Sequence, residues 1–340
     1  MKQKKHATIP IFVPHLGCPH NCIFCNQKSI TGVSEFDISN IEKEINCALK
    51  TITSNEKPEI AFFGGSFTGI EESLVISLLE IGRSYIEKGL ISSMRCSTRP
   101  DYINNHILSI LQYYGLETIE IGVQSMSDNV LTESLRGHTA ECTVNTMQMI
   151  KNAGFNLVGQ MMIGLPKSEP EDEVNCATAI INAGASGARI YPTAVFENTG
   201  LEKLMLSEKY KPLTVSDAVN RSANVAELFI DNHVKLLRIG LCESESLHSK
   251  NGIVAGAFHP ALGEMCASEI YRRKIEKNLK EKYDATYKNA IIYISSGNLS
   301  KAIGHKQSNK IYFYEKYNFN KIKFVEDDNL DDYELNVELK

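Results

Sequence analysis

The chain has 340 residues, of which 43% are hydrophobic and 23% are charged, and its formal net charge is −5. This length suits one large domain with a smaller appendage, or two domains. The composition is that of a soluble globular protein, and the negative charge argues against attraction of the whole molecule to nucleic acid, although it can hide basic patches. No apolar run approaches the length of a membrane span, and the first residues lack the apolar core of a signal peptide. We therefore expect a cytoplasmic protein that does not associate with a membrane.

Short apolar strands alternate with amphipathic helices through the first 193 residues. The predicted strands are residues 9–13, 59–63, 94–98, 118–123, 157–163 and 188–193, and a helical pattern follows each of the first five. Asp101 is expected to be the N-cap of the third helix. Such alternation indicates a parallel sheet with helices outside it. Two arrangements fit, an open doubly wound sheet and an incomplete barrel, and both place a functional site at the carboxyl ends of the strands.

After residue 200 the pattern changes. We expect a helix over residues 216–232, an additional edge strand at 234–239 and a charged helix over 264–283. Three short strands are then predicted at residues 290–295, 310–314 and 321–325, followed by an acidic tail that frays. We therefore divide the chain into a main domain, residues 1–240, and a small C-terminal α/β appendage with an acidic tail, residues 241–340.

Three cysteines lie within eight residues of one another, directly after the first predicted strand. They are Cys18, Cys22 and Cys25, and the chain has nine cysteines in all. An odd number with such a cluster favours a reducing compartment and a metal site over a disulfide framework. Thiolates at this spacing suit a soft metal ion or an iron–sulfur cluster. A zinc site would need a fourth ligand, for which His15 or His20 is near enough in the sequence.

Other polar or small residues gather where the predicted strands end. Paired glycines follow the second strand, and Glu120 and Gln124 interrupt the apolar fourth strand. Burying such polar groups without partners would cost on the order of a few kcal/mol each. A satisfied core network, or a salt bridge from Glu120 to Arg136, would explain them in structural terms.

The Cys-x3-Cys-x2-Cys spacing, with Phe24 before the last cysteine, resembles the cluster motif of radical S-adenosylmethionine (SAM) enzymes. This resemblance implies a partial (β/α)6 TIM-like barrel with a 4Fe–4S cluster on Cys18, Cys22 and Cys25. It implies that the fourth iron binds SAM, and that one electron cleaves SAM to a 5′-deoxyadenosyl radical that abstracts hydrogen from a substrate. The electron would come from a reducing donor of the flavodoxin or ferredoxin type.

Motifs on the later strands, over about residues 8 to 215, resemble the radical SAM half of the Elongator catalytic subunit family. They resemble oxygen-independent coproporphyrinogen oxidases more distantly. Too few residues follow to hold Elongator's acetyltransferase half, which we expect to be absent. The sequence Ser97-Thr-Arg-Pro-Asp101 has Ser97 where Elongator has Glu, and Gln160 stands where the oxidase has Asp. The resemblance implies that the SAM-binding residues are Phe24, Gly64, Gly65, Ser66, Gln124, Arg136 and Gln160.

The substrate is less well defined. From residue 271 to residue 310 there are ten Lys or Arg against three Asp or Glu. This run is either a solvated helix face or a patch that binds RNA. An RNA base, such as one in tRNA, is therefore one expected substrate, and a tetrapyrrole or small anionic metabolite is the alternative. The non-enzymatic alternative is a zinc-bearing RNA-binding adaptor, and the sequence does not indicate an oligomeric state.

Overall fold

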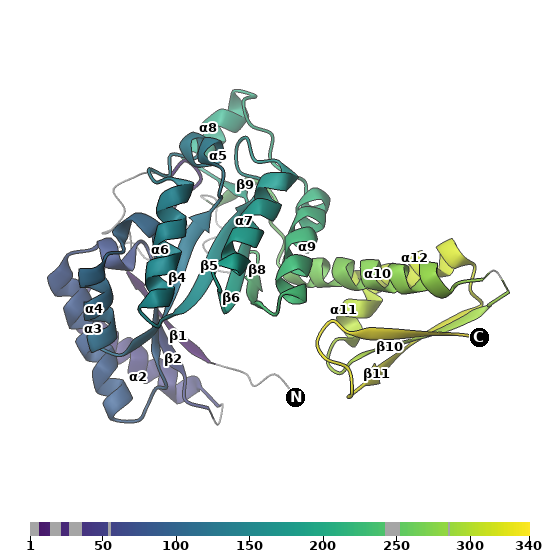
Figure 1. The fold of residues 1–340 in the computed structure, drawn as a ribbon, viewed down its shortest axis with the longest axis horizontal. Coiled ribbons are helices and arrows are strands. Elements are labelled where there is room, and N and C mark those ends of the chain that lie inside the picture. The colour runs from purple at the N-terminus through teal and green to yellow at the C-terminus, as the bar shows by residue number, and fades with distance from the viewer. Residues whose placement is uncertain (1–6, 14–21, 27–35, 54–55, 242–251, 285) are drawn as a thin grey trace.

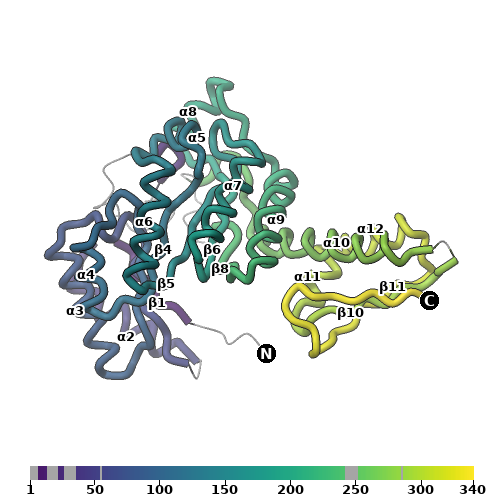
Figure 2. Tube along the Cα trace, viewed as in Figure 1, coloured from purple at the N-terminus to yellow at the C-terminus, as the bar shows by residue number. Residues whose placement is uncertain are grey.

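Seven parallel strands form one curved sheet, with helices around its outer side (Figures 1 and 2). The computed structural model describes residues 7–13, 22–26, 36–53, 56–241, 252–284 and 286–340. In spatial order the strands are β1 (Thr8–Val13), β2 (Glu59–Gly64), β3 (Met94–Thr98), β4 (Leu116–Gln124), β5 (Asn156–Ile163), β6 (Gly187–Pro192) and β8 (Lys235–Ile239). The main helices are α2 (Ile41–Thr51), α3 (Glu72–Glu87), α4 (Asn105–Tyr113), α5 (Asp128–Glu133), α6 (Ala140–Asn152), α7 (Pro170–Asn182), α8 (Gly200–Leu206) and α9 (Val215–Asp231).

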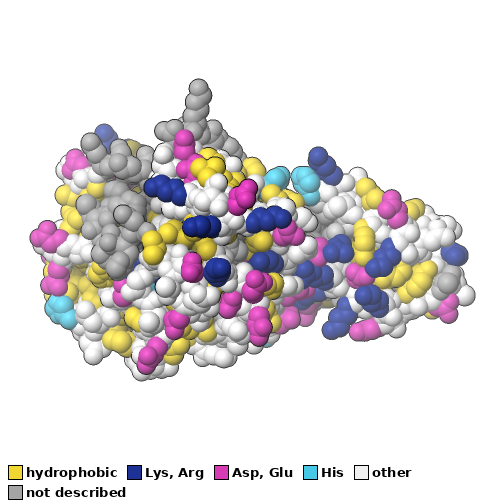
Figure 3. Space-filling model, turned by 90° about the horizontal axis from the view of Figure 1, so that it is seen from above, with side chains coloured by type: hydrophobic (Ala, Val, Ile, Leu, Met, Phe, Trp, Pro, Cys, Tyr) yellow, Lys and Arg dark blue, Asp and Glu magenta, His cyan; other side chains and the backbone are white. Residues whose placement is uncertain are grey.

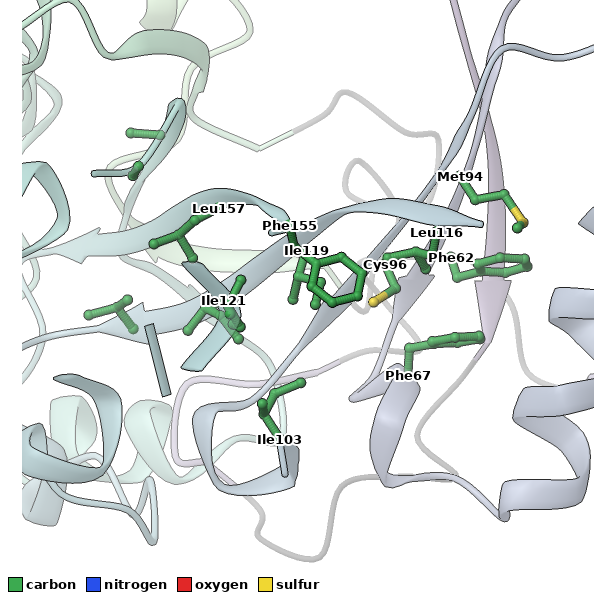
Figure 4. Close-up of a cluster of buried hydrophobic side chains, with 14 of the residues drawn as sticks. Phe62, Phe67, Met94, Cys96, Ile103, Leu116, Ile119, Ile121, Phe155 and Leu157 are labelled. Atoms are coloured by element: carbon green, nitrogen blue, oxygen red, sulfur yellow. The ribbon is translucent and has the colours of Figure 1, made fainter. Parts of the chain in front are cut away.

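The predicted fold class is confirmed, because successive strands pair in parallel as in a half-barrel. The expected edge strand is β8, which pairs with β6. A single hydrophobic core joins the strands to the surrounding helices. In the part of it shown in Figure 4, Phe62 stacks on Phe67 with ring centroids 4.6 Å apart, and Met94 and Cys96 lie nearby. Each such fully buried side chain contributes about 1.5–3 kcal/mol.

The C-terminal appendage has a hydrophobic core of its own, which includes Ile292 and Phe313. Its central strand β10 (Asn289–Ser295) pairs in parallel with β11 (Lys321–Asp327) and antiparallel with β12 (Leu335–Leu339). The long helix α10 (Leu262–Lys282) runs from the barrel into the appendage (Figure 1). Its first turns pack on α9 through Leu262 and Cys266, whereas its later turns belong to the appendage core. The remaining elements are the short strands β7 (Ala194–Phe196) and β9 (Ile253–Gly256), which pair with each other, and the helices α11 (Leu299–Ile303) and α12 (Ser308–Tyr317).

Three local expectations are wrong. Residues 310–314 lie in α12, not in a strand, because Phe313 and Tyr317 are buried at helical spacing and outweigh the strand preference of the aromatic run. The tail does not fray throughout, since β12 places Val337 in the core. The helix after β3 takes its N-cap from Asn104, whose side chain accepts a hydrogen bond from the Ile107 amide. The division of the chain at residue 240 stays a prediction.

None of the helices in the described ranges is long and apolar enough to cross a membrane.

Candidate functional site

Backbone hydrogen bonds hold the segment that carries Cys22 and Cys25 at the carboxyl end of the sheet. The Ile23 amide donates to the Ser134 carbonyl at 3.3 Å, and the Ile23 carbonyl accepts from the Leu201 amide at 2.7 Å. The Cys25 amide donates to the Cys22 carbonyl at 3.0 Å, which closes a turn. The end of α5 and the start of α8 therefore hold this segment in place. Cys18, the third predicted ligand, lies outside the described residues, as do His15 and His20.

Two buried arginines converge on the sulfur of Cys22. Arg136, 5% exposed, points Nη1 at the Cys22 sulfur from 3.4 Å and donates from Nη2 to the Gly122 carbonyl at 2.7 Å. Arg99, 4% exposed, approaches the same sulfur with Nη1 at 3.8 Å. The carboxylate of Asp101 accepts from the other side of the Arg99 guanidinium at 2.9 and 2.8 Å. Two buried cations therefore lie beside a sulfur of the predicted cluster motif.

Two buried polar atoms beside this pair have no hydrogen-bond partner among the described residues. They are Nε of Arg136 and Oε1 of Gln124. Gln124 also has a left-handed backbone, with φ of 62°, at an irregularity in the β4–β5 pairing. Strained residues and unsatisfied buried groups concentrate at functional sites. These atoms therefore mark the end of β4 as a place for a polar ligand.

The donor set fits an iron–sulfur cluster. Cys22 is buried and Cys25 is half-buried, and soft thiolates are the protein ligands of such clusters. The described ranges contain no group of three or more Cys, His, Asp or Glu side chains arranged to hold a metal ion. Cys18 as the third ligand stays a prediction from the spacing.

The paired glycines bring the end of β2 against the end of β1, from which the cysteine loop departs. Gly64 has φ of +115°, and a Cβ there would lie 2.6 Å from the Val13 carbonyl oxygen. The Gly65 amide donates to that same oxygen at 3.0 Å, and Ser66 is buried. Only glycine permits this close backbone approach. The close contact with Val13 thus explains why residue 64 is glycine. The SAM-binding roles of Gly64, Gly65 and Ser66 stay predictions.

Glu120 is fully buried, and two arginines bind its carboxylate. Arg95 donates to it at 2.8 Å, and Arg189 donates through Nε at 2.8 Å and Nη2 at 3.1 Å. Of the two structural explanations, the satisfied core network is confirmed for Glu120, and the salt bridge to Arg136 is wrong because Arg136 turns toward Cys22. Burial alone would raise the pKa of Glu120, but the ion pairs with Arg189 and Arg95 outweigh it and hold the pKa below its usual value.

Gln160 belongs to the same network. Its side-chain amide donates to Glu120 at 2.8 Å and to the Ser97 hydroxyl at 3.1 Å. The strand register places Gln160 beside Arg189 and Ser97 beside Glu120. The side-chain nitrogen of Gln160 is thus engaged inside the barrel. Its predicted contact with a ribose is not tested.

Phe24 lies at the other side of the cysteine segment. It is half-buried and packs against a small apolar group that includes Ile23, Val195 and Leu201. This packing orients the turn between Cys22 and Cys25. The predicted contact of Phe24 with adenine stays a prediction.

Comparison with known families identifies the class. The family described as the Radical SAM superfamily matches residues 12–177, and the Radical_SAM C-terminal domain matches residues 185–272. The chain belongs to the radical SAM superfamily. It is therefore an enzyme of the class whose cofactors are a 4Fe–4S cluster and SAM, and the expected recognition and cofactors are confirmed.

Relatives of this radical SAM chain include Elongator complex protein 3. The human protein is 34% identical over 149 residues, which are 42% of this chain and 27% of the human one. The mouse protein is 26% identical over 256 residues, which are 63% of this chain and 47% of the mouse one. The chain thus spans less than half the length of these curated relatives. A structure of the archaeal Methanocaldococcus infernus Elp3 superposes with a TM-score of 0.64 at 21% identity, covering 79% of this chain and 63% of that one, and shows that the fold is shared.

Sequence reasoning missed Arg99 as a residue of the site. The signal was present, because Arg99 directly follows the third strand in Ser97-Thr-Arg-Pro-Asp101. The sequence favours Asp101 as a helix cap, whereas in the structure its carboxylate binds the Arg99 guanidinium.

Proposed function

We propose that this radical SAM enzyme holds its cluster on Cys18, Cys22 and Cys25 at the carboxyl end of the half-barrel. The observation that carries the proposal is the Cys22 sulfur, which two buried guanidinium groups approach at 3.4 and 3.8 Å. When bound, the cluster and SAM supply a one-electron cleavage of the sulfonium that leads to hydrogen abstraction from a substrate. A reducing donor of the flavodoxin or ferredoxin type would provide the electron.

Each residue at the strand ends would contact a different part of SAM. Arg136 has a buried Nε without a partner among the described residues, which suits the SAM carboxylate. The side-chain oxygen of Gln124 is also buried without a partner among the described residues, which suits a ribose hydroxyl as donor. Gly64, Gly65 and Ser66 would leave room for the methionine amino group, and Phe24 and Gln160 would flank the nucleoside.

Anaerobic purification tests this assignment. The wild-type protein is expected to be brown, to hold about four irons per chain and to cleave SAM when dithionite is added. Cys22→Ser and Cys25→Ser should lose iron and SAM cleavage together. Cys47→Ser is the matched control, because Cys47 is an exposed free thiol on α2. A colourless wild-type protein with one bound zinc would overturn the proposal.

We propose an RNA base as the substrate, supported by the likeness to Elongator complex protein 3 and by lysines of the appendage. Lys274 and Lys280 pair with Asp231 and Glu276 at 3.6 and 3.5 Å. Lys277 and Lys306 are exposed and have no acidic partner within the described ranges. Figure 3 shows Lys and Arg side chains interleaved with acidic ones over the junction of barrel and appendage. The unpaired lysines are therefore the best candidates for phosphate contacts.

Salt-dependent binding of a tRNA tests the role of Lys277 and Lys306. Lys277→Glu and Lys306→Glu should each weaken binding and reduce the slope of log K against log salt by about one. Lys43→Glu, an exposed position on α2, is the charge-matched control and should change neither quantity beyond the effect of net charge. Equal effects of all three variants would contradict a specific RNA surface on the appendage.

A further inference from the structure

Arg99 lies directly after β3 and makes polar contacts on three sides. Asp101 holds one edge of its guanidinium with two hydrogen bonds, at 2.9 and 2.8 Å. Nη2 also donates to the backbone carbonyl of Arg136, and Nη1 faces the sulfur of Cys22 at 3.8 Å. Asp101 thereby fixes the plane of the guanidinium, with Nη1 toward the cysteine and Nη2 toward the Arg136 carbonyl.

The contact with the Arg136 backbone has a structural consequence for the second arginine. Gly137, which follows Arg136, has a left-handed φ of 76°, so the chain turns sharply there. The Arg136 amide is held by the Leu131 carbonyl at 3.0 Å, and its carbonyl is held by Arg99. Both backbone polar groups of Arg136 are thus fixed, and its side chain leaves this anchored point toward Cys22.

We propose that Arg99 is a positioning residue that raises the reduction potential of the cluster and holds Arg136 in place. The inference rests on the proposed function, because it assumes that Cys22 is a cluster ligand. Hydrogen bonds to cluster sulfurs and nearby charge are the terms by which a protein sets such potentials. A reduced cluster carries one more negative charge than an oxidised one, so a buried cation beside a ligand sulfur favours reduction.

Because Arg99 pairs with Asp101, removing the cation and removing the anion should shift the reduction potential in opposite directions. Arg99→Met removes the cation and leaves the Asp101 carboxylate, so both effects disfavour reduction. Asp101→Asn keeps the cation and removes the anion, so it should favour reduction. A role confined to packing would not reverse sign between the two variants. Arg221→Met is the matched control, because Arg221 also forms a buried ion pair, with Glu173 at 2.6 Å, on α9 and α7.

The experiment is a potentiometric titration of the iron-loaded full chain, followed by electron paramagnetic resonance. Arg99→Met should lower the ratio of reduced to oxidised cluster at a fixed potential about tenfold, which is 59 mV for one electron. Asp101→Asn should shift the potential the opposite way, Arg99→Lys should stay nearer to the wild type, and Arg221→Met should not shift it. If Arg99→Met does not fold or bind iron, the opposite shift in Asp101→Asn still gives the sign.

Two results would count against the inference in different ways. Unchanged potentials in Arg99→Met and Asp101→Asn, with a normal wild-type cluster, would overturn the role of Arg99 and leave the proposed function intact. Shifts of the same sign in both variants would also overturn it. A wild-type protein without a cluster would instead refute the proposed function, and the inference with it.

Discussion

Replacing Glu120 with glutamine should destabilise the barrel strongly while leaving the appendage folded. The Glu120 side chain is 0% exposed and receives charged hydrogen bonds from Arg95 and Arg189. Arg95 would keep its contact with Glu59 at 2.8 Å, but Arg189 would lose the carboxylate charge and at least one of its two bonds to this side chain. Removing one partner of a buried ion pair costs about 3–5 kcal/mol. We expect the free energy of unfolding of the barrel to fall by about that amount.

Hydrogen exchange by mass spectrometry can locate the loss. A change of about 3 kcal/mol is more than a hundredfold in the opening equilibrium, so amides of β3 to β6 should exchange correspondingly faster in Glu120→Gln. Amides of β10 and α12 should not change, because the appendage has a separate hydrophobic core. Glu87→Gln is the control, since Glu87 forms an exposed pair with Arg83, and exposed pairs are worth at most about 1 kcal/mol.

The same variant has a predicted dependence on pH. The pKa of Glu120 in the folded protein lies below its ordinary value of 4.5, so the carboxylate contributes stability that is present above the unfolded pKa. That contribution is lost as pH falls below about 4.5 and the carboxylate is protonated. The difference in stability between wild type and Glu120→Gln should therefore be constant near neutral pH and should shrink below that window. A loss under about 1 kcal/mol at neutral pH, or a difference that grows on acidification, would refute the reasoning.

Gly64→Ala should lower the free energy of unfolding by several kcal/mol, because the new Cβ would meet the Val13 carbonyl oxygen at 2.6 Å. Gly154 is the control: its φ is +86° and a Cβ there would meet nothing within 4 Å, so Gly154→Ala should cost only about 1 kcal/mol. Equal melting temperatures for the two variants would contradict this prediction. Burial, followed by the charge of Arg136, lowers the pKa of His138 to about 4, so its ring should show no NMR titration above about pH 5, and stability should fall as pH drops from about 6.5 toward 4; a midpoint near 6.5 would exclude the buried neutral ring.

The order of strands and helices could be predicted because each barrel element carries its own periodic pattern. Runs such as Ile60 to Phe62 are apolar and buried on both faces, which is typical of buried parallel strands. The appendage was harder because tertiary packing decides its elements. The aromatic run at the start of α12 favours a strand by composition, yet Phe313 and Tyr317 reach the core only from a helix. Likewise, β12 exists because β10 offers it an edge, which no local pattern in the acidic tail reveals.

Sequence reasoning gathered the site residues at the strand ends but could not assign partners to the arginines. Arg95 and Arg189 lie within β3 and β6, Arg99 follows β3 and Arg136 follows α5. Only Arg136 has a role predicted from the sequence. In the structure Arg95 and Arg189 are matched by the carboxylates of Glu59 and Glu120 inside the barrel. Those charges cancel locally, so they specify the packing of the strands. Such matching depends on strand register and barrel curvature, which set distances that a single sequence does not encode explicitly.

Arg99 and Arg136 have fewer carboxylate partners than Arg95 and Arg189, and this difference bears on function. Within the described ranges only one carboxylate, that of Asp101, pairs with these two guanidinium groups. The remaining positive charge faces the sulfur of Cys22. Because two buried guanidinium groups share one carboxylate among the described residues, negative charge supplied by the site would stabilise the arrangement. Cysteine thiolates carrying an iron–sulfur cluster would supply it, and the carboxylate of SAM would add to it.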